Sequence, residues 1–177
     1  MGAEISEPAR PAPVYLHVYD LGCSGEMQTL NMLLSAVGSG AFHCGVEVHG
    51  KEWSFNATTR GSGVFTSQPR ECPAHSYRTS VLMGHTMFSD EEVKTMCSVL
   101  RAEWKGPSYD MLTKNCCHFC DIFCRKLGVG PIPFWTTNLA GAGATVKNVY
   151  KSTVDSLYPS LLMGCITGRD EKGRVIY

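Results

Sequence analysis

The residues most able to do chemistry follow Asn115, where two adjacent cysteines, Cys116 and Cys117, open a predicted helix. Asparagine is a favoured N-cap residue, so the first unpaired backbone amides of such a helix lie at Cys116 and just after it. A thiol at this position feels the positive end of the helix dipole, and we expect a lowered pKa and a larger thiolate fraction. Cys116 is therefore a candidate nucleophile, and its own backbone N–H could hold a developing oxyanion.

Helical spacing distinguishes the two adjacent cysteines. Positions three and four residues apart share one face of a helix. One such stripe contains Cys116, Phe119, Cys120, Phe123 and Leu127. Cys117 falls on a neighbouring, more polar face, so we expect Cys116 to point toward a sheet or cleft and Cys117 to point sideways. The alternative for Cys116 is a small buried core residue, which is a common role for a free cysteine.

A cysteine nucleophile needs a base, and histidine is the usual one. The six histidines are His17, His43, His49, His75, His85 and His118. His43 lies early in a predicted strand, and the neighbouring Gly45 leaves room for a partner side chain. His118 lies about 200° around the helix from Cys116 and does not readily reach the thiol. His43 is thus a candidate base, although from spacing alone a half-exposed strand histidine is the simpler interpretation.

A metal site is the competing interpretation of the cysteine-rich helix. A separate Cys-x-x-His sequence runs from Cys72 to His75. The potential ligands on the helix are Cys116, Cys117, His118, Cys120 and Cys124. Structural zinc usually joins two knuckles with turn geometry, whereas this dense cluster lies on a helix. We therefore expect no metal ion and no cofactor.

The chain has the composition of one globular domain. Its 177 residues are enough to bury a core, and 44% hydrophobic with 18% charged residues favours a folded chain over a disordered one. Lys and Arg balance Asp and Glu at 16 each, with no basic run, so we expect no nucleic-acid partner. The nine cysteines are odd in number and follow no secretion signal. We expect free thiols in a cytoplasmic protein, with the nucleus or a membrane surface as further locations.

Membrane contact would depend on the N-terminus, because no stretch reaches the roughly 18 apolar residues that span a bilayer. The first residues fit the loose pattern for N-myristoylation, with Gly2 as the acceptor and Ser6 at the favoured position. Such short patterns often arise by chance, and a single myristoyl chain anchors a protein only marginally. We expect peripheral membrane association only if Gly2 carries the lipid.

Strands and helices must bring these candidates together. Alternating or β-rich segments predict strands at 14–20, 42–48, 52–56, 64–67 and 77–83. Helical spacing predicts helices at 26–37, at 89–105, at 116–127 and within 135–154. Ser89 and Glu92 fit a capping box at the start of the second helix. We expect an α+β fold in which a small antiparallel sheet or partial barrel has helices packed to one side.

Four segments resemble motifs of the desumoylating isopeptidase (PPPDE, or DeSI-like) family. The sequence FHCGVEV at 42–48, followed by GKE at 50–52, is similar to the family's histidine motif. The sequence YDMLTKNCCHFC at 109–120 is similar to its cysteine motif. VYDL at 18–21 and PIPFW at 131–135 also fit. The resemblance covers roughly residues 14–145, which is nearly all of the predicted globular part.

The resemblance implies a circularly permuted papain-like cysteine peptidase fold, in which the catalytic histidine precedes the catalytic cysteine. Matched position by position, these residues are His43 and Cys116. Residues 14–154 would form the catalytic domain, between a flexible leader at 1–13 and a C-terminal tail at 155–177. Family members usually carry asparagine after the catalytic cysteine, where this chain has Cys117, and the second thiol could alter redox sensitivity.

Three functions follow as alternatives. The resemblance implies a thiol isopeptidase that acts on ubiquitin or SUMO conjugates. Some relatives are linked instead to removal of palmitoyl thioesters, which would need an apolar groove, and the segments at 83–88 and 132–135 are candidates. A non-catalytic ubiquitin-like binding module is the third alternative, although it would not need the intact Cys116 and His43 pair. Glu47 shares the strand face of His43 and could orient its ring, but a solvated surface carboxylate is the simpler interpretation.

Overall fold

The computed structural model describes residues 10–21, 42–72, 74–111, 113–137, 168–169 and 175–176. Gly2, the predicted helix at 26–37 and most of the segment at 135–154 lie outside these ranges, so what we expect of them stays a prediction.

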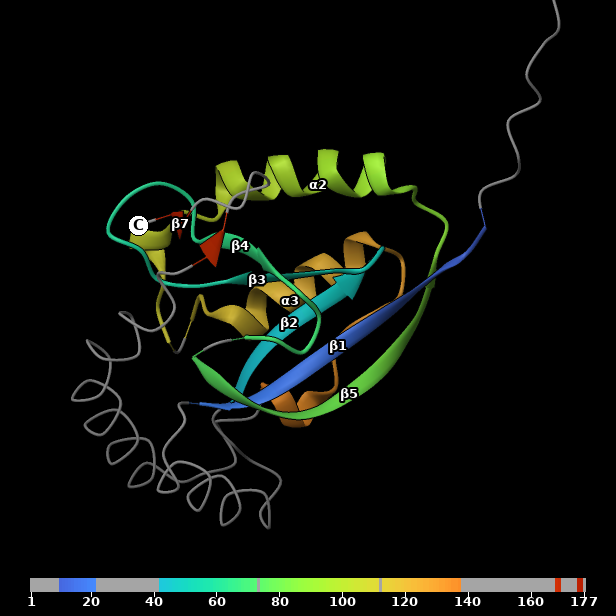
Figure 1. The fold of residues 1–177 in the computed structure, drawn as a ribbon, viewed down its shortest axis with the longest axis horizontal. Coiled ribbons are helices and arrows are strands. Elements are labelled where there is room, and N and C mark those ends of the chain that lie inside the picture. Colours follow the sequence, from blue (N-terminus) through green and yellow to red (C-terminus); the bar gives the residue numbers. More distant parts are fainter. Residues whose placement is uncertain are drawn as a thin grey trace, which may run out of the picture.

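A curved, five-stranded antiparallel sheet forms the centre of the fold (Figure 1). Its strands are β1 (Ala12–Leu21), β2 (Phe42–Val48), β3 (Lys51–Phe55), β4 (Val64–Ser67) and β5 (His75–Thr86). They lie in the order β4-β3-β2-β1-β5, and every neighbouring pair is antiparallel. The five predicted strands are confirmed, and β5 extends beyond 77–83 at both ends. Two further short strands, β6 (Gly168–Arg169) and β7 (Val175–Ile176), pair with each other inside the predicted tail.

The hairpin between β2 and β3 fixes the register of the strand that carries His43. Its two turn residues, His49 and Gly50, both have positive φ, at 50° and 69°. Two consecutive residues of this kind give the tight turn whose twist matches that of the flanking strands. The turn sets Val48 opposite Lys51, and the ladder continues from there along both strands.

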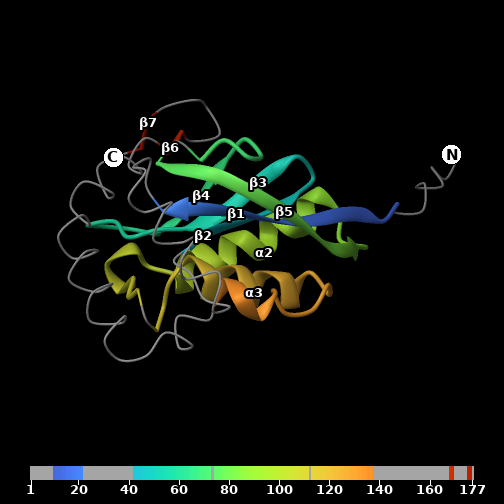
Figure 2. The same ribbon diagram turned by 90° about the horizontal axis from the view of Figure 1, so that it is seen from below.

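Two helices pack on one face of this sheet (Figure 2). The helix α2 (Asp90–Glu103) begins at Ser89, which accepts from the Glu92 amide while the Glu92 carboxylate accepts from the Ser89 amide. The helix α3 (Cys116–Lys126) begins at Asn115. Two 3₁₀ turns complete the described helical structure, η1 (Gly106–Ser108) and η2 (Phe134–Thr136). The capping box and the packing of helices on one side confirm both predictions, and the chain has the expected α+β fold.

The hydrophobic core lies between α3 and the strands β2 and β3. Phe119 and Phe123 project from the predicted helical stripe and are fully buried against Phe55 and Trp53. Trp104 packs edge-on against Phe55 at 4.9 Å between ring centroids, an orientation that aromatic pairs favour. This packing fixes the angle at which the N-terminus of α3 meets the start of β2.

The opposite face of the sheet is also buried around His43, which the strand pattern did not predict. His43 is 2% exposed, so the half-exposed strand histidine considered from the sequence is wrong. The cover comes from the chain between β3 and β5: Phe65 and His75 both lie against the His43 ring, and the Arg70 amide donates to Glu52. Polar side chains buried on this face must therefore form hydrogen bonds with one another.

None of the helices in the described residues combines the length and the apolar character needed to cross a membrane.

Candidate active site

The N-terminus of α3 carries Cys116 in its first position. The Asn115 side chain accepts a hydrogen bond from the His118 amide at 3.1 Å, and the Asn115 carbonyl accepts from the Phe119 amide. The amides of Cys116 and Cys117 make no hydrogen bond to any other described residue, as expected for the first turn of a capped helix. The backbone N–H of Cys116 is therefore available to donate to a ligand.

Both adjacent thiols face the start of β2. The sulfur atoms of Cys116 and Cys117 each lie 3.7 Å from the carbonyl oxygen of Phe42, and Cys117 is also 3.6 Å from the Cys44 sulfur. The expectation that Cys117 points sideways on a polar face is wrong, since it is only 4% exposed. The first turn of α3 lies against the start of β2, so that two successive positions reach the same carbonyl.

The electrostatic setting of Cys116 differs from that expected at a helix N-terminus. The pKa of its thiol is raised above the usual value, first by the hydrogen bond with Cys117 and then by burial. The charge and hydrogen bonding of His43 act in the opposite direction and favour the thiolate. The expected lowering of the pKa is thus wrong for this arrangement, because the neighbouring thiol and the loss of water raise it. Cys116 rests as a neutral thiol beside His43.

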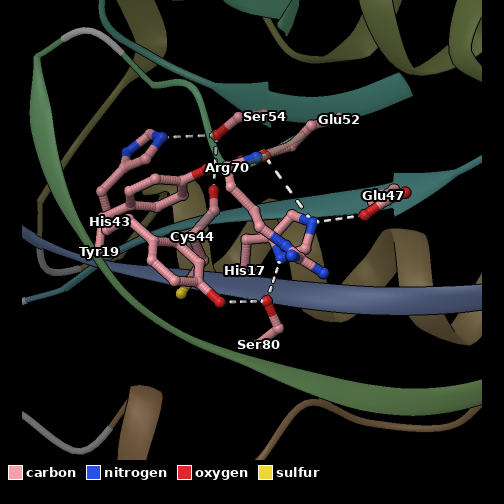
Figure 3. Close-up of polar contacts among 10 residues, drawn as sticks. His17, Tyr19, His43, Cys44, Glu47, Glu52, Ser54, Arg70 and Ser80 are labelled. Carbon is pink, nitrogen blue, oxygen red and sulfur yellow. Dashed lines mark hydrogen bonds and ion pairs between the residues drawn. The ribbon is translucent and has the colours of Figure 1, made fainter. Parts of the chain in front are cut away.

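The His43 ring is oriented by Ser54 on the adjacent strand β3. Nε2 of His43 lies 2.9 Å from Oγ of Ser54, and that hydroxyl donates its one proton to the Cys44 carbonyl at 2.6 Å (Figure 3). Ser54 must therefore accept from Nε2–H, because it has no second proton to give. The network selects the tautomer of neutral His43 that carries its proton on Nε2 and leaves Nδ1 with a free lone pair. Such an imidazole can take a proton at Nδ1.

Glu47, the candidate orienting carboxylate, contacts a different histidine. Its Oε2 lies 2.7 Å from Nε2 of His17, whose Nδ1 lies 2.7 Å from the Ser80 hydroxyl (Figure 3). Glu47 is four residues from His43, which is about 13 Å along an extended strand. The structure thus brings Ser54, and not Glu47, to the ring of His43. Sequence reasoning missed Ser54.

A buried carboxylate, Glu52, lies on β3, two residues before Ser54. It is 1% exposed and accepts from the Tyr19 hydroxyl at 2.8 and 2.9 Å and from the Arg70 amide at 2.8 Å. A Cβ atom at Gly45 would overlap the Glu52 carboxylate, so the glycine next to His43 makes room for Glu52. Burial and then the Glu52 charge raise the pKa of Tyr19, which keeps this phenol protonated as a donor.

The ring of His75 stacks on the ring of His43. The two ring centroids are 4.5 Å apart, with 26° between the ring planes. Burial and then the neighbouring His43 lower the pKa of His75 to about 2. His75 is therefore neutral and adds no positive charge next to the candidate base.

The remaining sequence candidates have structural roles. Nδ1 of His118 contacts the Asn115 side chain and completes the cap of α3. Nε2 of His49 lies 2.9 Å from the Phe88 carbonyl. Cys120 and Cys124 are buried in the core under α3. The cysteines of α3 therefore divide between the start of β2, which Cys116 and Cys117 contact, and the core, which holds Cys120 and Cys124.

Comparison with known proteins identifies the family of this chain. A family model described as "PPPDE putative peptidase domain" matches residues 12–156. The chain belongs to this peptidase family.

Three curated relatives are similar in sequence to this chain. A DeSI-like protein of Arabidopsis thaliana is 37% identical over 142 residues, which cover 80% of this chain and 61% of the relative. A desumoylating isopeptidase 1 homolog of Caenorhabditis elegans is 29% identical over 171 residues, covering 93% of this chain and 48% of the relative. The DeSI-like protein sdu1 of Schizosaccharomyces pombe is 30% identical over 139 residues, which cover 77% of this chain and 68% of the relative. The chain thus spans about half to two thirds of the length of these relatives.

Proposed function

We propose that this protein is a thiol isopeptidase that cleaves ubiquitin or SUMO conjugates, with Cys116 as nucleophile and His43 as base. The observation that carries the proposal is a pair of hydrogen bonds: Ser54 donates to the Cys44 carbonyl and accepts from Nε2–H of His43, which leaves Nδ1 of His43 unprotonated. The charge and hydrogen bonding of His43 in turn favour the thiolate form of Cys116. Membership of a peptidase family supports a hydrolase. The name of the nematode relative, a desumoylating isopeptidase homolog, supports SUMO-conjugated proteins as substrates.

The neutral thiol of Cys116 decides how the reaction starts. Because its pKa is raised, the resting site does not hold a preformed thiolate, and the proton must leave as the sulfur attacks. His43 takes that proton at Nδ1 while the sulfur forms a bond to the isopeptide carbonyl carbon. The imidazolium keeps both of its N–H groups, and Ser54 continues to accept from Nε2–H.

The later steps use the same groups in reverse. The carbonyl oxygen becomes an oxyanion, and the free backbone N–H of Cys116 donates to it. The C–N bond then breaks, and the lysine amine leaves with the proton that His43 returns. A water molecule then gives one proton to His43 and attacks the thioester carbonyl carbon. The C–S bond breaks, His43 returns that proton to the Cys116 sulfur, and the carboxyl group of the released modifier loses its own proton to solvent.

An acyl-protein thioesterase with the same pair is the second candidate. The observation that favours it is Phe134, which is 74% exposed on η2. The next residue, Trp135, packs edge-on against Phe42, whose carbonyl lies beside the Cys116 sulfur. An apolar acyl chain that followed η2 would thus approach the thiol.

Turnover assays with matched variants test the proposal. We expect the full chain to cleave a ubiquitin- or SUMO-linked lysine substrate. Cys116→Ala and His43→Ala should each lower kcat/KM by at least about a thousandfold. Cys124→Ala removes another buried thiol of α3 and should leave the rate within about threefold of wild type. Cleavage of a palmitoyl thioester alone, dependent on Cys116, would favour the second candidate, and activity that survives both substitutions would refute the pair.

A further inference from the structure

Three buried metal-ligating side chains converge beside the proposed active site. His43 comes from β2, Cys72 from the connection between β4 and β5, and His75 from the start of β5. A ligand atom from each lies within 4.8 Å of the other two. Cys72 and His75 are 6% and 8% exposed. This group includes the Cys-x-x-His sequence seen in the chain but joins it to His43 instead of to the cysteines of α3.

The donor set is the kind that zinc prefers. One thiolate sulfur and two imidazole nitrogens are its commonest protein ligands, and three such ligands leave a fourth position for water or another group. With Zn–S of about 2.3 Å and Zn–N of about 2.0–2.1 Å, tetrahedral ligand atoms lie about 3.3–3.6 Å apart. The described separations therefore need to contract by up to about 1.2–1.5 Å. The stacked rings of His43 and His75 must also turn relative to each other, so that the lone pair of each imidazole points at the metal. Hard cations such as Mg²⁺ and Ca²⁺ prefer oxygen ligands and do not suit this set.

We propose that Cys72, His75 and His43 bind a zinc ion, and that zinc bound there reversibly switches off the enzyme. The binding follows from the three convergent side chains alone. The inhibition also rests on the proposed function, because it acts through the role of His43 as base.

Inhibition follows whichever nitrogen of His43 binds the metal. A neutral imidazole has one lone pair available, and the other nitrogen carries the proton. Zinc on Nδ1 occupies the lone pair that would accept the Cys116 proton. Zinc on Nε2 displaces the bond to Ser54 and leaves the proton on Nδ1, which then cannot accept another. In both cases zinc fixes the His43 ring, and the imidazole no longer has a lone pair that can accept the Cys116 proton.

Cobalt binding tests the site without any assay of activity. Co²⁺ substitutes for zinc and reports thiolate ligation by a near-ultraviolet charge-transfer band and tetrahedral geometry by its visible bands. We expect the metal-free full chain to bind one Co²⁺ with both signals. Cys72→Ser should abolish the charge-transfer band and weaken the affinity by at least about tenfold. Cys97→Ser, which changes a buried thiol of α2, should leave both unchanged.

A second ligand variant guards against misfolding. His75→Asn removes a different member of the set, so its loss of Co²⁺ affinity, with an unchanged circular dichroism spectrum, would support the site independently. The absence of a charge-transfer band in the wild type would overturn the proposal, as would a band that persists in Cys72→Ser.

Zinc titration of the active enzyme tests the consequence. We expect Zn²⁺ to inhibit the wild type and a chelator to restore its rate. Relative to its own metal-free rate, Cys72→Ser should need at least about tenfold more zinc for the same fractional inhibition. Equal zinc sensitivity of the two proteins would refute the switch. If the chain binds Co²⁺ through Cys72 but cleaves no conjugate, the metal site stands and the proposed function fails.

Discussion

Replacing Ser54 by alanine isolates the role that the structure gives to this residue. The serine hydroxyl is buried, accepts from Nε2–H of His43 at 2.9 Å and donates to the Cys44 carbonyl at 2.6 Å. Alanine removes both bonds without adding volume. The His43 ring would then lose its bias toward the tautomer whose Nδ1 can accept a proton, while Cys116 and the rest of the fold stay in place.

The size of the effect follows from the two bonds. Each buried hydrogen bond contributes about 0.5–1.5 kcal/mol, so we expect Ser54→Ala to lower the free energy of unfolding by about 1–3 kcal/mol. The bond to His43 alone would bias the tautomer by about 1 kcal/mol, which corresponds to at most roughly fivefold in rate. Because the bias concerns proton transfer and not binding, kcat should fall by this factor while KM stays unchanged.

The assay combines kinetics with a direct reading of the tautomer. Steady-state cleavage of a conjugate gives kcat and KM, and ¹⁵N NMR of labelled histidine shows which nitrogen of His43 carries the proton. Ser54→Thr keeps the hydroxyl and should restore most of kcat. Ser67→Ala is a matched control, since the buried hydroxyl of that β4 serine has no hydrogen-bond partner among the described residues. A Ser54→Ala protein with normal kcat and the Nε2–H tautomer would refute the reasoning.

Three further substitutions test other parts of the site. Cys117→Ala removes the largest cause of the raised pKa of Cys116, so the pH profile of Cys116 alkylation, followed by peptide mass spectrometry, should move to lower pH; an unmoved profile would contradict the assigned cause. Gly45→Ala forces a methyl group against the buried Glu52 carboxylate and should cost at least about 2 kcal/mol in urea unfolding, whereas a neutral result would show that Glu52 can move. Asn115→Ala removes the cap of α3 and should lower stability by about 0.5–2 kcal/mol, with Asn115→Asp retaining most of it.

Most of the scaffold could be predicted because local signals decided it. The alternation of Phe42 to Val48 and the Ser89 and Glu92 capping box each specify one element without reference to the rest of the chain. The burial of the second sheet face could not be predicted in this way. It depends on β4, the connection that follows it and the start of β5 lying against His43, and that connection has no periodic pattern.

The site shows the same division. Cys116 and His43 were found from a helix cap and a family resemblance, but Ser54 needs the register between strands. Val46 lies opposite Trp53, so Ser54 lies opposite Gly45 and diagonally across from His43 on the same face. The two-residue turn after Val48 is a signal from which this register could have been worked out. Glu47 shares the strand face of His43, but it lies four residues further along β2, about 13 Å away, and the adjacent strand brings Ser54 closer.

The raised pKa of Cys116 could not be predicted from the sequence. The helix dipole and the neighbouring thiol act in opposite directions on the same proton, and their balance depends on burial. Sequence places Cys117 next to Cys116 but does not show that both reach the Phe42 carbonyl.

The most direct test of the account maps the residue that reacts with a modifier. Ubiquitin and SUMO probes that carry a C-terminal electrophile should form a covalent adduct with the full chain, and peptide mass spectrometry should place it on Cys116 and not on Cys117. The adduct should disappear in Cys116→Ala and form far more slowly in His43→Ala. An adduct on Cys117, or one that forms equally well without Cys116, would contradict the central claim that Cys116 is the nucleophile.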